Sequence, residues 1–238
     1  MKKLLVIIVC ALATISGVNA QGVSFGVRTG LNVANAGGDF KDNKNYGEDM
    51  DFKSKVGFHV GVIADIELSK SFYLQPGLYF STKGLKAEDK DNDADYSEKL
   101  NYNLNYLELP ILASYRFNIS DNVKWQINAG PYFALGVGGK MKTTITDEGE
   151  KMEYKSDAFG TEKEDDEEIK GGLKRFDAGL SFGTGISISK IYIGIKYDLG
   201  LANIADKKSE MWGGFGEDGN KALKVRNRNF AVSVGYTF

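Results

Sequence analysis

Apolar and polar residues alternate with a period of two along most of this chain. In the final stretch, residues 229–238, one side of an extended strand carries Phe230, Val232, Val234, Tyr236 and Phe238. The same alternation marks residues 23–33, 56–68, 72–80, 107–117, 123–137, 176–188 and 191–201. Each segment approaches the ~9–11 residues that a tilted strand needs to cross a membrane, and helical periodicity is nearly absent. The pattern predicts an all-β protein of eight strands.

Short and long connections alternate between these segments. The short ones are tight turns at residues 68–71, 118–122 and 189–190. The long ones are polar and rich in Gly, Asp and Lys, and they span residues 36–55, 83–100, 140–174 and 202–225. Outer-membrane barrels have short periplasmic turns and longer extracellular loops. We therefore expect an eight-stranded antiparallel up-and-down transmembrane β-barrel in the bacterial outer membrane, with both termini in the periplasm because the strand number is even.

The two faces of the predicted strands separate a membrane barrel from a soluble one. A soluble lipocalin-type barrel turns its apolar face inward and its polar face to water. Here the face opposite the apolar one is largely glycine, for example at Gly30, Gly61, Gly183 and Gly235. Glycine does little for a solvated face but suits the narrow interior of an eight-stranded barrel. We therefore place the Leu, Ile, Val and aromatic face against outer-membrane lipid.

Aromatic residues gather at the predicted strand ends. One set would lie at the periplasmic rim: Phe25, Phe72, Phe117, Trp125 and Phe238. The other would lie at the outer rim: Phe58, Phe80, Phe133, Phe176 and Phe230. Two aromatic girdles are expected of a transmembrane barrel. The alternative, a β-sandwich with these aromatics in its core, agrees less well with the loops and the glycine face.

Residues 1–20 predict a secretory signal peptide. The segment has a basic start, an apolar run too short to span a bilayer, and small residues before Gln21. Cleavage after Ala20 would leave residues 21–238 as one outer-membrane β-barrel domain. Cys10 lies inside the apolar run, which argues against a lipoprotein, and it is the only cysteine. Thiol catalysis, disulfides and cysteine-based metal sites are therefore excluded for the mature chain.

The charged residues predicted to face the interior balance in sign. They are Arg28, Asp65, Glu67, Glu108, Arg116, Lys124, Arg175, Asp177, Lys196 and Asp198. Buried charges must be paired or solvated. We expect a salt-bridge network that plugs the lumen, and a small polar pore is the alternative. The formal net charge of −2 gives no basic field for nucleic acid, which is not expected as a partner.

Three motifs resemble sites of chemistry. Residues 89–95 are rich in Asp but lack the glycine and glutamate of an EF-hand, so a solvated loop is preferred over weak divalent-ion binding. Residues 214–219 match the G-x-G-x-x-G pattern without a strand–helix unit around them. His59, the only histidine, is predicted to face inward, away from lipid, and a lipid-modifying barrel enzyme remains the alternative. We expect no catalytic residue, no cofactor and no metal.

One segment carries a family resemblance. Residues 106–117, YLELPILASYRF, resemble the YLE-P-L strand of PorT-like outer-membrane β-barrels. FDAGL at 176–180 and YDLGL at 197–201 are similar to that family's sixth and seventh strands. The resemblance covers the strands and not the loops. It implies a small outer-membrane barrel domain. PorT is linked to the type IX secretion and gliding apparatus, so a role in such an apparatus is an alternative.

The ending of the chain resembles the signal that the β-barrel assembly machinery reads during biogenesis. Its candidate residues are Phe230, Tyr236 and Phe238, in an alternating strand that finishes on an aromatic. A closed barrel must pair its last strand with its first, which also explains why the alternation continues to the final residue.

Three prolines lie within predicted strands: Pro76, Pro110 and Pro131. Each removes a hydrogen-bond donor from the ladder, and a closed barrel has no edge on which to place it. We expect β-bulges at these strands to accommodate them.

Together, these patterns predict a non-enzymatic outer-membrane β-barrel with a structural or surface-interaction role. An extracellular or secretion-machinery protein would meet the loops. The third long loop is the expected contact, because residues 161–169 gather six acidic side chains in one run.

Overall fold

The computed structural model describes residues 22–38, 51–90, 96–159, 161–164, 167–170, 172–206 and 224–238. The expected signal peptide, most of the acidic stretch at 89–95, and the glycine motif at 214–219 lie outside the described residues. The strands are β1 (Val23–Gly38), β2 (Asp51–Ser69), β3 (Phe72–Lys90), β4 (Tyr96–Ser120), β5 (Val123–Asp147), β6 (Glu150–Asp157), β7 (Thr161–Glu164), β8 (Glu167–Lys170), β9 (Phe176–Ile188), β10 (Ile191–Gly200) and β11 (Val225–Thr237). Within these ranges, no helix is long and apolar enough to cross a membrane.

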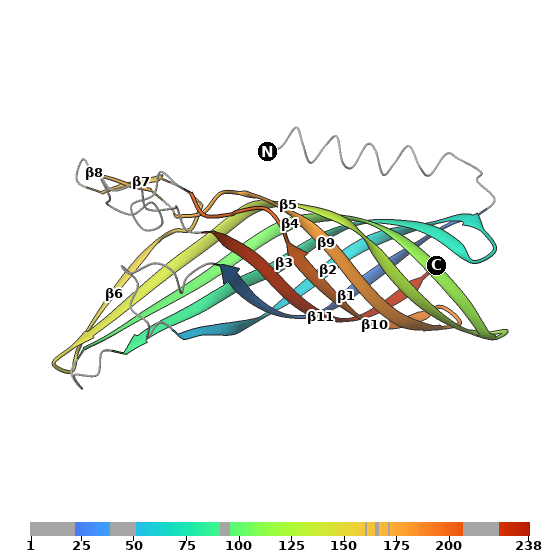
Figure 1. Cartoon of the computed structure of the whole chain (residues 1–238), viewed down its shortest axis with the longest axis horizontal. Coiled ribbons are helices and arrows are strands. Elements are labelled where there is room, and N and C mark those ends of the chain that lie inside the picture. The colour runs from blue at the N-terminus through green and yellow to red at the C-terminus, as the bar shows by residue number, and fades with distance from the viewer. Residues whose placement is uncertain are drawn as a thin grey trace.

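Eight antiparallel strands close into a ring (Figure 1). They pair in the order β1-β2-β3-β4-β5-β9-β10-β11, and β11 pairs back onto β1. The closing register places Gly26 opposite Thr237 and Leu31 opposite Val232, so the terminal strand is held along its length. The remaining described strands stand outside the ring, with β6 added to β5 and β7 paired to β8. The predicted eight-stranded up-and-down barrel is confirmed.

The strand alternation separates an outer apolar surface from a polar interior. Val232 is 45% exposed, whereas its neighbour Ser233 is 9% exposed and faces the lumen. The aromatic rings predicted for one rim lie side by side on the outside, with Phe117 stacked on Trp125 at 4.8 Å between centroids. Phe58 and Phe80 are 6.0 Å apart near the other end of their strands. The outward apolar face is the one that lipid requires.

The strands continue well beyond the segments predicted from apolar alternation. Residues 83–100 and 140–147 were expected to be loop, yet β3 and β4 pair as far as Lys90 opposite Ser97. β4 and β5 continue to Tyr96 opposite Asp147, and β6 folds back along β5. These extensions form a sheet that projects past the ring at the end away from the C-terminus (Figure 1). The apolar pattern missed them because a strand outside the bilayer does not need a lipid-facing side.

The acidic stretch of the third loop is also partly ordered into strand. Its backbone forms the β7–β8 hairpin, with Thr161 opposite Lys170 and Glu164 opposite Glu167. A β-hairpin that pairs only with itself is marginal on its own, so this hairpin adds little rigidity to the projecting sheet.

The prolines are accommodated by gaps in the ladder, and the expected bulges at these positions are absent. Pro76 remains opposite Ile111 in β4, and Pro110 remains opposite Tyr132 in β5. Pro131 remains opposite Leu180 in β9. On its other side, each proline falls in a stretch of about two unpaired positions across which the register does not change. A missing N–H therefore interrupts pairing with one neighbour only, and the second neighbour keeps the strand in place.

Candidate functional site

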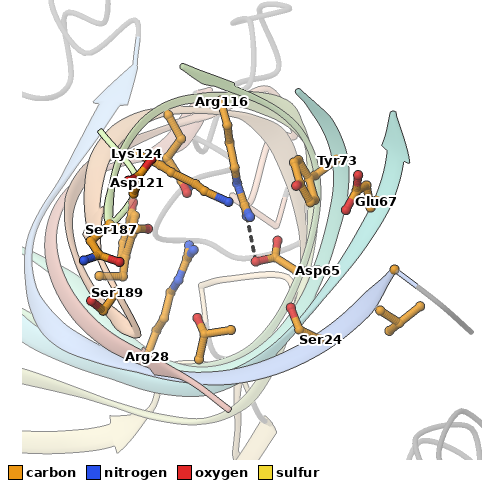
Figure 2. A pocket seen from close by; sticks show the side chains of 16 residues that line it. Ser24, Arg28, Asp65, Glu67, Tyr73, Arg116, Asp121, Lys124, Ser187 and Ser189 are labelled. Carbon is orange, nitrogen blue, oxygen red and sulfur yellow. Dashed lines mark ion pairs between the residues drawn. The ribbon is translucent and has the colours of Figure 1, made fainter. Parts of the chain in front are cut away.

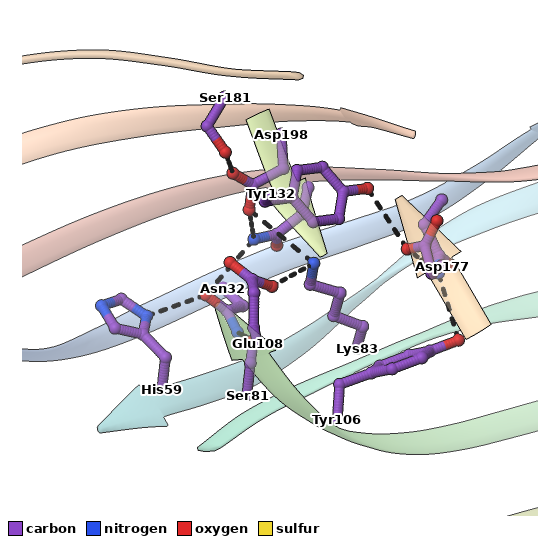
Figure 3. Close-up of polar contacts among 12 residues, drawn as sticks. Asn32, His59, Ser81, Lys83, Tyr106, Glu108, Tyr132, Asp177, Ser181 and Asp198 are labelled. Atoms are coloured by element: carbon purple, nitrogen blue, oxygen red, sulfur yellow. Dashed lines mark hydrogen bonds and ion pairs between the residues drawn. The ribbon is translucent and has the colours of Figure 1, made fainter. Parts of the chain in front are cut away.

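Four charged side chains form a closed ring deep in the lumen. The Nζ atom of Lys83 lies 2.6 Å from Oε2 of Glu108 and 3.8 Å from Oδ2 of Asp198. The Nζ atom of Lys196 lies 2.8 Å from Oε1 of Glu108 and 3.0 Å from Oδ1 of Asp198. Each ammonium group therefore contacts both carboxylates, and the four charges sum to zero. Because β3 and β4 lie across the barrel from β10, the ring joins opposite walls. Figure 3 shows three of its members, Lys83, Glu108 and Asp198.

Uncharged polar groups complete the environment of this ring. Ser181 donates to Oδ1 of Asp198 at 2.6 Å, and Asn229 donates to Oδ2 at 3.1 Å. The ammonium of Lys83 lies 4.8 Å from the centre of the Tyr132 ring, a cation–π distance. Buried charges are tolerated when they are paired and hydrogen-bonded in this way. The arrangement braces the lumen.

A third buried carboxylate, Asp177, lies beside the ring. Its Oδ2 atom accepts hydrogen bonds from Tyr132 at 3.2 Å and from Asn227 at 2.9 Å. Asn227 is also 3.2 Å from the hydroxyl of Tyr106. This carboxylate is therefore held by neutral donors, in contrast to the two carboxylates of the ring (Figure 3).

An apolar cluster lies at the mouth of the lumen nearest the projecting sheet. It packs Tyr102, Leu104 and Tyr106 of β4 against residues from the segments that connect the strands, among them Ala158, Leu173 and Ile204. Backbone hydrogen bonds tie these crossing segments together: Leu173 N–H to Ala158 O at 3.1 Å, and Ile204 N–H to Val225 O at 2.9 Å. These segments cover the mouth, and we call this cluster the cap.

The opposite end of the lumen holds a cavity of about 400 Å³ among the short turns and the chain's last strand. We call it the vestibule (Figure 2). In it, Nη2 of Arg116 lies 2.6 Å from Oδ2 of Asp65, and Gln75 donates to Oδ1 of Asp65 at 2.6 Å. The Arg28 guanidinium lies 3.8 Å from the centre of the Tyr192 ring. Lys124 also lines this cavity, and Glu67 lies exposed at its rim.

The predicted interior charges therefore fall into groups. Glu108, Lys196 and Asp198 meet in the ring, with Asp177 beside them. Arg28, Asp65, Glu67, Arg116 and Lys124 line the vestibule. Within the described residues, no ion pair joins the two groups, so the expected salt-bridge network is divided into two separate parts.

Arg175 is placed differently from the prediction. It precedes β9, is exposed, and donates from Nη1 to the carbonyl of Gly136 at 3.0 Å. Its guanidinium lies 5.5 Å from the centre of the Phe159 ring, outside the charged ring. Strand alternation gives no inward direction to a residue that the strand does not include.

Lys83 is the residue that the sequence analysis missed. It is 3% exposed and occupies one corner of the ring. It was assigned to a loop because polar residues follow it, although Ser81, two positions earlier, already pointed inward. Extending the period of two by one step would have found it.

His59 lies in a polar contact that resembles a hydrolase constellation. Its Nε2 atom is 2.9 Å from Oγ of Ser233, and its Nδ1 atom is 2.9 Å from Oδ1 of Asn32. The vestibule reaches neither His59 nor Ser233. Both are buried on the lumen side, away from the lipid face, and Asn32 is further tied by its amide to Ser81 at 3.0 Å. These contacts link β1, β2 and β11.

The described residues hold no group of three or more His, Cys, Asp or Glu side chains arranged to bind a metal ion. In the projecting sheet, Glu88 instead meets two lysines, with Oε2 at 2.6 Å from Lys53 and Oε1 at 3.0 Å from Lys99. Hydrogen bonds from these ammonium groups lower the pKa of Glu88 to about 2. This carboxylate stays ionised and acts as a cross-strand link.

The predicted assembly residues lie on the outer surface at and near the chain end. The rings of Tyr236 and Phe238 meet edge-on at 5.6 Å. The Phe238 N–H donates to the Phe25 carbonyl at 2.9 Å, so the final residue is tied to β1. Phe230 is 41% exposed on the same face. This exposed surface belongs to the outward apolar face.

Comparisons with known proteins give several solved structures and one family profile. The solved structures similar to this chain include Ail, the attachment invasion locus protein of Yersinia pestis, at 14% identity and a TM-score of 0.38, covering 92% of this chain and 100% of Ail. Neisserial surface protein A is 14% identical with a TM-score of 0.42 and the same coverage of 92% and 100%. OprG from Pseudomonas aeruginosa is 10% identical with a TM-score of 0.45, covering 91% of this chain and 96% of OprG.

A comparison with curated protein sequences finds no match. A family profile matches residues 19–206, which include most of the ring strands. Its description is the outer membrane protein beta-barrel domain. The closed ring, its outward apolar face and this match together show that the chain belongs to the outer membrane protein beta-barrel domain family.

Proposed function

We propose that this outer-membrane barrel is a non-enzymatic surface-interaction protein, which uses its projecting sheet to contact another protein outside the cell. The observation that carries the proposal is the continuation of β3, β4 and β5 past the ring, with β6 added at the side. Ring closure leaves the start of β1 and the end of β11 at the end with the short turns, and we assign that end to the periplasm. The sheet then faces the exterior.

Strand β6 is the expected contact. Among the described strands it pairs only with β5, so its other edge presents backbone donors and acceptors. Met152 and Tyr154 are 45% and 57% exposed on this strand. Lys142 holds Glu153 at 2.6 Å, which fixes β6 to β5. An ordered edge strand with charged side chains resists self-association and still admits a chosen partner.

Photo-crosslinking on whole cells tests this role. A crosslinking amino acid at Met152 or Tyr154 should yield a protein adduct, identified by mass spectrometry. The same amino acid at Lys190, exposed in a short turn at the opposite end, is the matched control. Absence of an adduct at both β6 positions, or the same adduct from Lys190, would remove β6 as the contact.

We also propose that the lumen passes little ion current. The charged ring, with its members from opposite walls, and the cap at the mouth support this proposal. An eight-stranded interior is only wide enough for side chains. The purified protein in planar bilayers should show no stable porin-like steps. Large, reproducible channel openings would contradict this proposal and favour the small polar pore.

Direct measurements distinguish two alternative roles from the proposed surface-interaction role. Membership in a PorT-like secretion or gliding apparatus predicts that a detergent pull-down recovers components of that machinery. A lipid-modifying enzyme predicts an altered lipid A profile in a deletion strain, and labelling of Ser233 by a fluorophosphonate. We expect an unchanged lipid profile and no labelling, because His59 and Ser233 are buried on the lumen side, away from the lipid face.

Assembly by the β-barrel machinery is proposed to depend on the aromatic ending. Deleting Phe238 should lower the amount of barrel in the outer membrane, while the purified variant still refolds in detergent. The reason is that one rim residue, 69% exposed, contributes little burial to the folded barrel. Immunoblotting of outer-membrane fractions measures the effect, and unchanged levels would remove assembly recognition as its cause.

A further inference from the structure

We propose that the vestibule is a binding site for a small oxyanion, of the phosphate or carboxylate class, held by Arg28 together with Arg116. The site lies at the end of the lumen that carries the short turns and the chain terminus. It is separate from the projecting sheet, and it does not depend on the surface role proposed above.

Arg28 is the central observation. The residue is nine-tenths buried, at 9% exposure, and its guanidinium lies 3.8 Å over the ring of Tyr192. Its Nε atom has no hydrogen-bond acceptor among the described residues. Figure 2 shows Arg28 pointing into the cavity, where no ion pair links it to any carboxylate drawn there. A buried guanidinium that is stacked but not paired has donors to offer a ligand.

The backbone around Arg28 is shaped to hold it. A side chain at Gly235 would come within 2.8 Å of the Cγ atom of Arg28. Side chains at Gly185 or Gly194 would collide with the ring of Tyr192. Glycine at these positions leaves room for the stacked pair, so the guanidinium has a fixed place before any ligand arrives. Such preorganisation reduces the entropy lost on binding.

Arg116 approaches the same cavity from β4. Its Nη2 atom is fixed by Asp65 at 2.6 Å, and its guanidinium lies 3.9 Å from the centre of the Tyr73 ring. Its Nε atom also has no acceptor among the residues described. Figure 2 shows Lys124 of β5 pointing inward beside it. Three cationic side chains from three strands therefore converge on one cavity.

The carboxylates of the vestibule do not cancel this field at its deep end. Asp65 is already engaged by Arg116 and by Gln75 at 2.6 Å. Glu67 and Asp121 are exposed at the rim, where water and salt screen their charge. The buried cation Arg28 is screened far less. The inner part of the cavity therefore favours a negative ligand.

The geometry of the donors selects the class of anion. A guanidinium presents paired N–H groups whose spacing matches two oxygens of a phosphate or a carboxylate. A spherical halide offers no such pair of acceptors and fits less well. A cavity of about 400 Å³ admits either group, free or as the end of a larger molecule. The capped mouth lies at the other end of the lumen, so such a ligand enters from the side of the short turns.

Titration of the isotope-labelled barrel in detergent micelles tests the proposal. Potassium phosphate and potassium acetate are added separately at constant ionic strength, with chloride as the balancing salt. Saturable shifts of the Gly194, Gly235 and Arg28 N–H signals are expected with at least one of them. Saturation by both indicates a general oxyanion site, and saturation by one alone names the class. Shifts that match those of chloride for both salts would overturn the proposal.

Variants locate the site. Arg28→Gln should weaken the apparent affinity at least tenfold, whereas Lys190→Gln, which removes a charge from an exposed turn at the same end, should leave it unchanged. Circular dichroism checks that each variant is folded. If Arg28→Gln does not fold, Arg28→Lys keeps the charge without the guanidinium fork and should weaken binding severalfold. Equal affinity of wild type and whichever Arg28 variant folds would overturn the assignment.

Discussion

The two charged regions of the lumen use the same residue types in different ways. In the ring, Lys83 and Lys196 each contact both carboxylates, and none of the four charges is left over. In the vestibule, Arg116 has one carboxylate partner and Arg28 has an aromatic ring in place of one. A fully paired cluster stabilises a structure, whereas an incompletely paired one retains capacity to bind. Counting charges cannot separate the two cases, because only the contacts differ.

Breaking the ring should have the largest effect. Glu108→Lys replaces the carboxylate that both lysines share, and it leaves three ammonium groups around one aspartate. The loss of stability should reach ~3–5 kcal/mol, because the remaining charges are buried without compensation. Urea unfolding in micelles measures the change. Glu67 is an exposed carboxylate at the vestibule rim, so Glu67→Lys is the matched control. An equal loss of stability in that variant would show that the loss does not depend on the contacts of the ring.

A charge placed on the outer face provides a reference for the stability loss expected in the ring. Val232→Arg should cost ~2–4 kcal/mol if residue 232 lies near the bilayer midplane, because lipid offers the guanidinium no partner. The same unfolding measurement in lipid vesicles checks it. Ser233→Val, which removes the hydroxyl beside His59, should cost less. A larger loss from Ser233→Val would invert the assignment of inside and outside.

Breaking the vestibule pair should cost less than breaking the ring. Asp65→Asn keeps the shape but removes the charge that faces Arg116, whose side chain is 13% exposed. We expect a loss of roughly 1–3 kcal/mol, since water at this end solvates part of the guanidinium. Comparison of the unfolding midpoints of Asp65→Asn and Glu108→Gln decides the order. A greater loss from Asp65→Asn would mean that the vestibule, too, is primarily a brace.

The smallest effect is expected in the projecting sheet, and it depends on pH. Folding lowers the pKa of Glu88 from 4.5 to about 2, so its stabilisation is present above pH 4.5 and is lost as the pH falls toward 2. Protection factors for amide hydrogen exchange, corrected for the intrinsic pH dependence of the exchange rate, should fall in the paired ends of β3 and β4 across that window. Glu88→Gln should remove this part of the acid response, with little change near neutral pH. An identical acid response in the variant would assign it to other carboxylates.

The sequence carried enough information for the barrel because lipid imposes a simple rule. A residue such as Val232 must face outward and Ser233 must not, and that period of two recurs in each ring strand. The projecting sheet obeys no such rule, so residues 83–100 were assigned to a loop. Its strands are held by cross-strand pairs such as Glu88 with Lys99, which a one-dimensional pattern does not contain.

The site was predictable only in part for a related reason. Alternation can say that Glu108 and Arg28 point inward, and the structure agrees. It cannot say which inward charges meet, because partners such as Lys83 and Asp198 lie far apart in the chain and meet across the lumen. The contact of His59 with Ser233 is of the same kind, joining residues 174 positions apart. Closure of the ring creates these neighbours.

Closure of the barrel also determines the order in which contacts form during folding. Gly26 pairs with Thr237, so the seam between β1 and β11 joins almost the two ends of the chain and cannot form until the last strand is present. Contacts of such long sequence separation form slowly. Lys196 and Asp198, on β10, reach Lys83 and Glu108 only when the sheet curls into a barrel. The charges that brace the finished barrel are therefore hydrated for most of its folding, and their dehydration belongs to its final step.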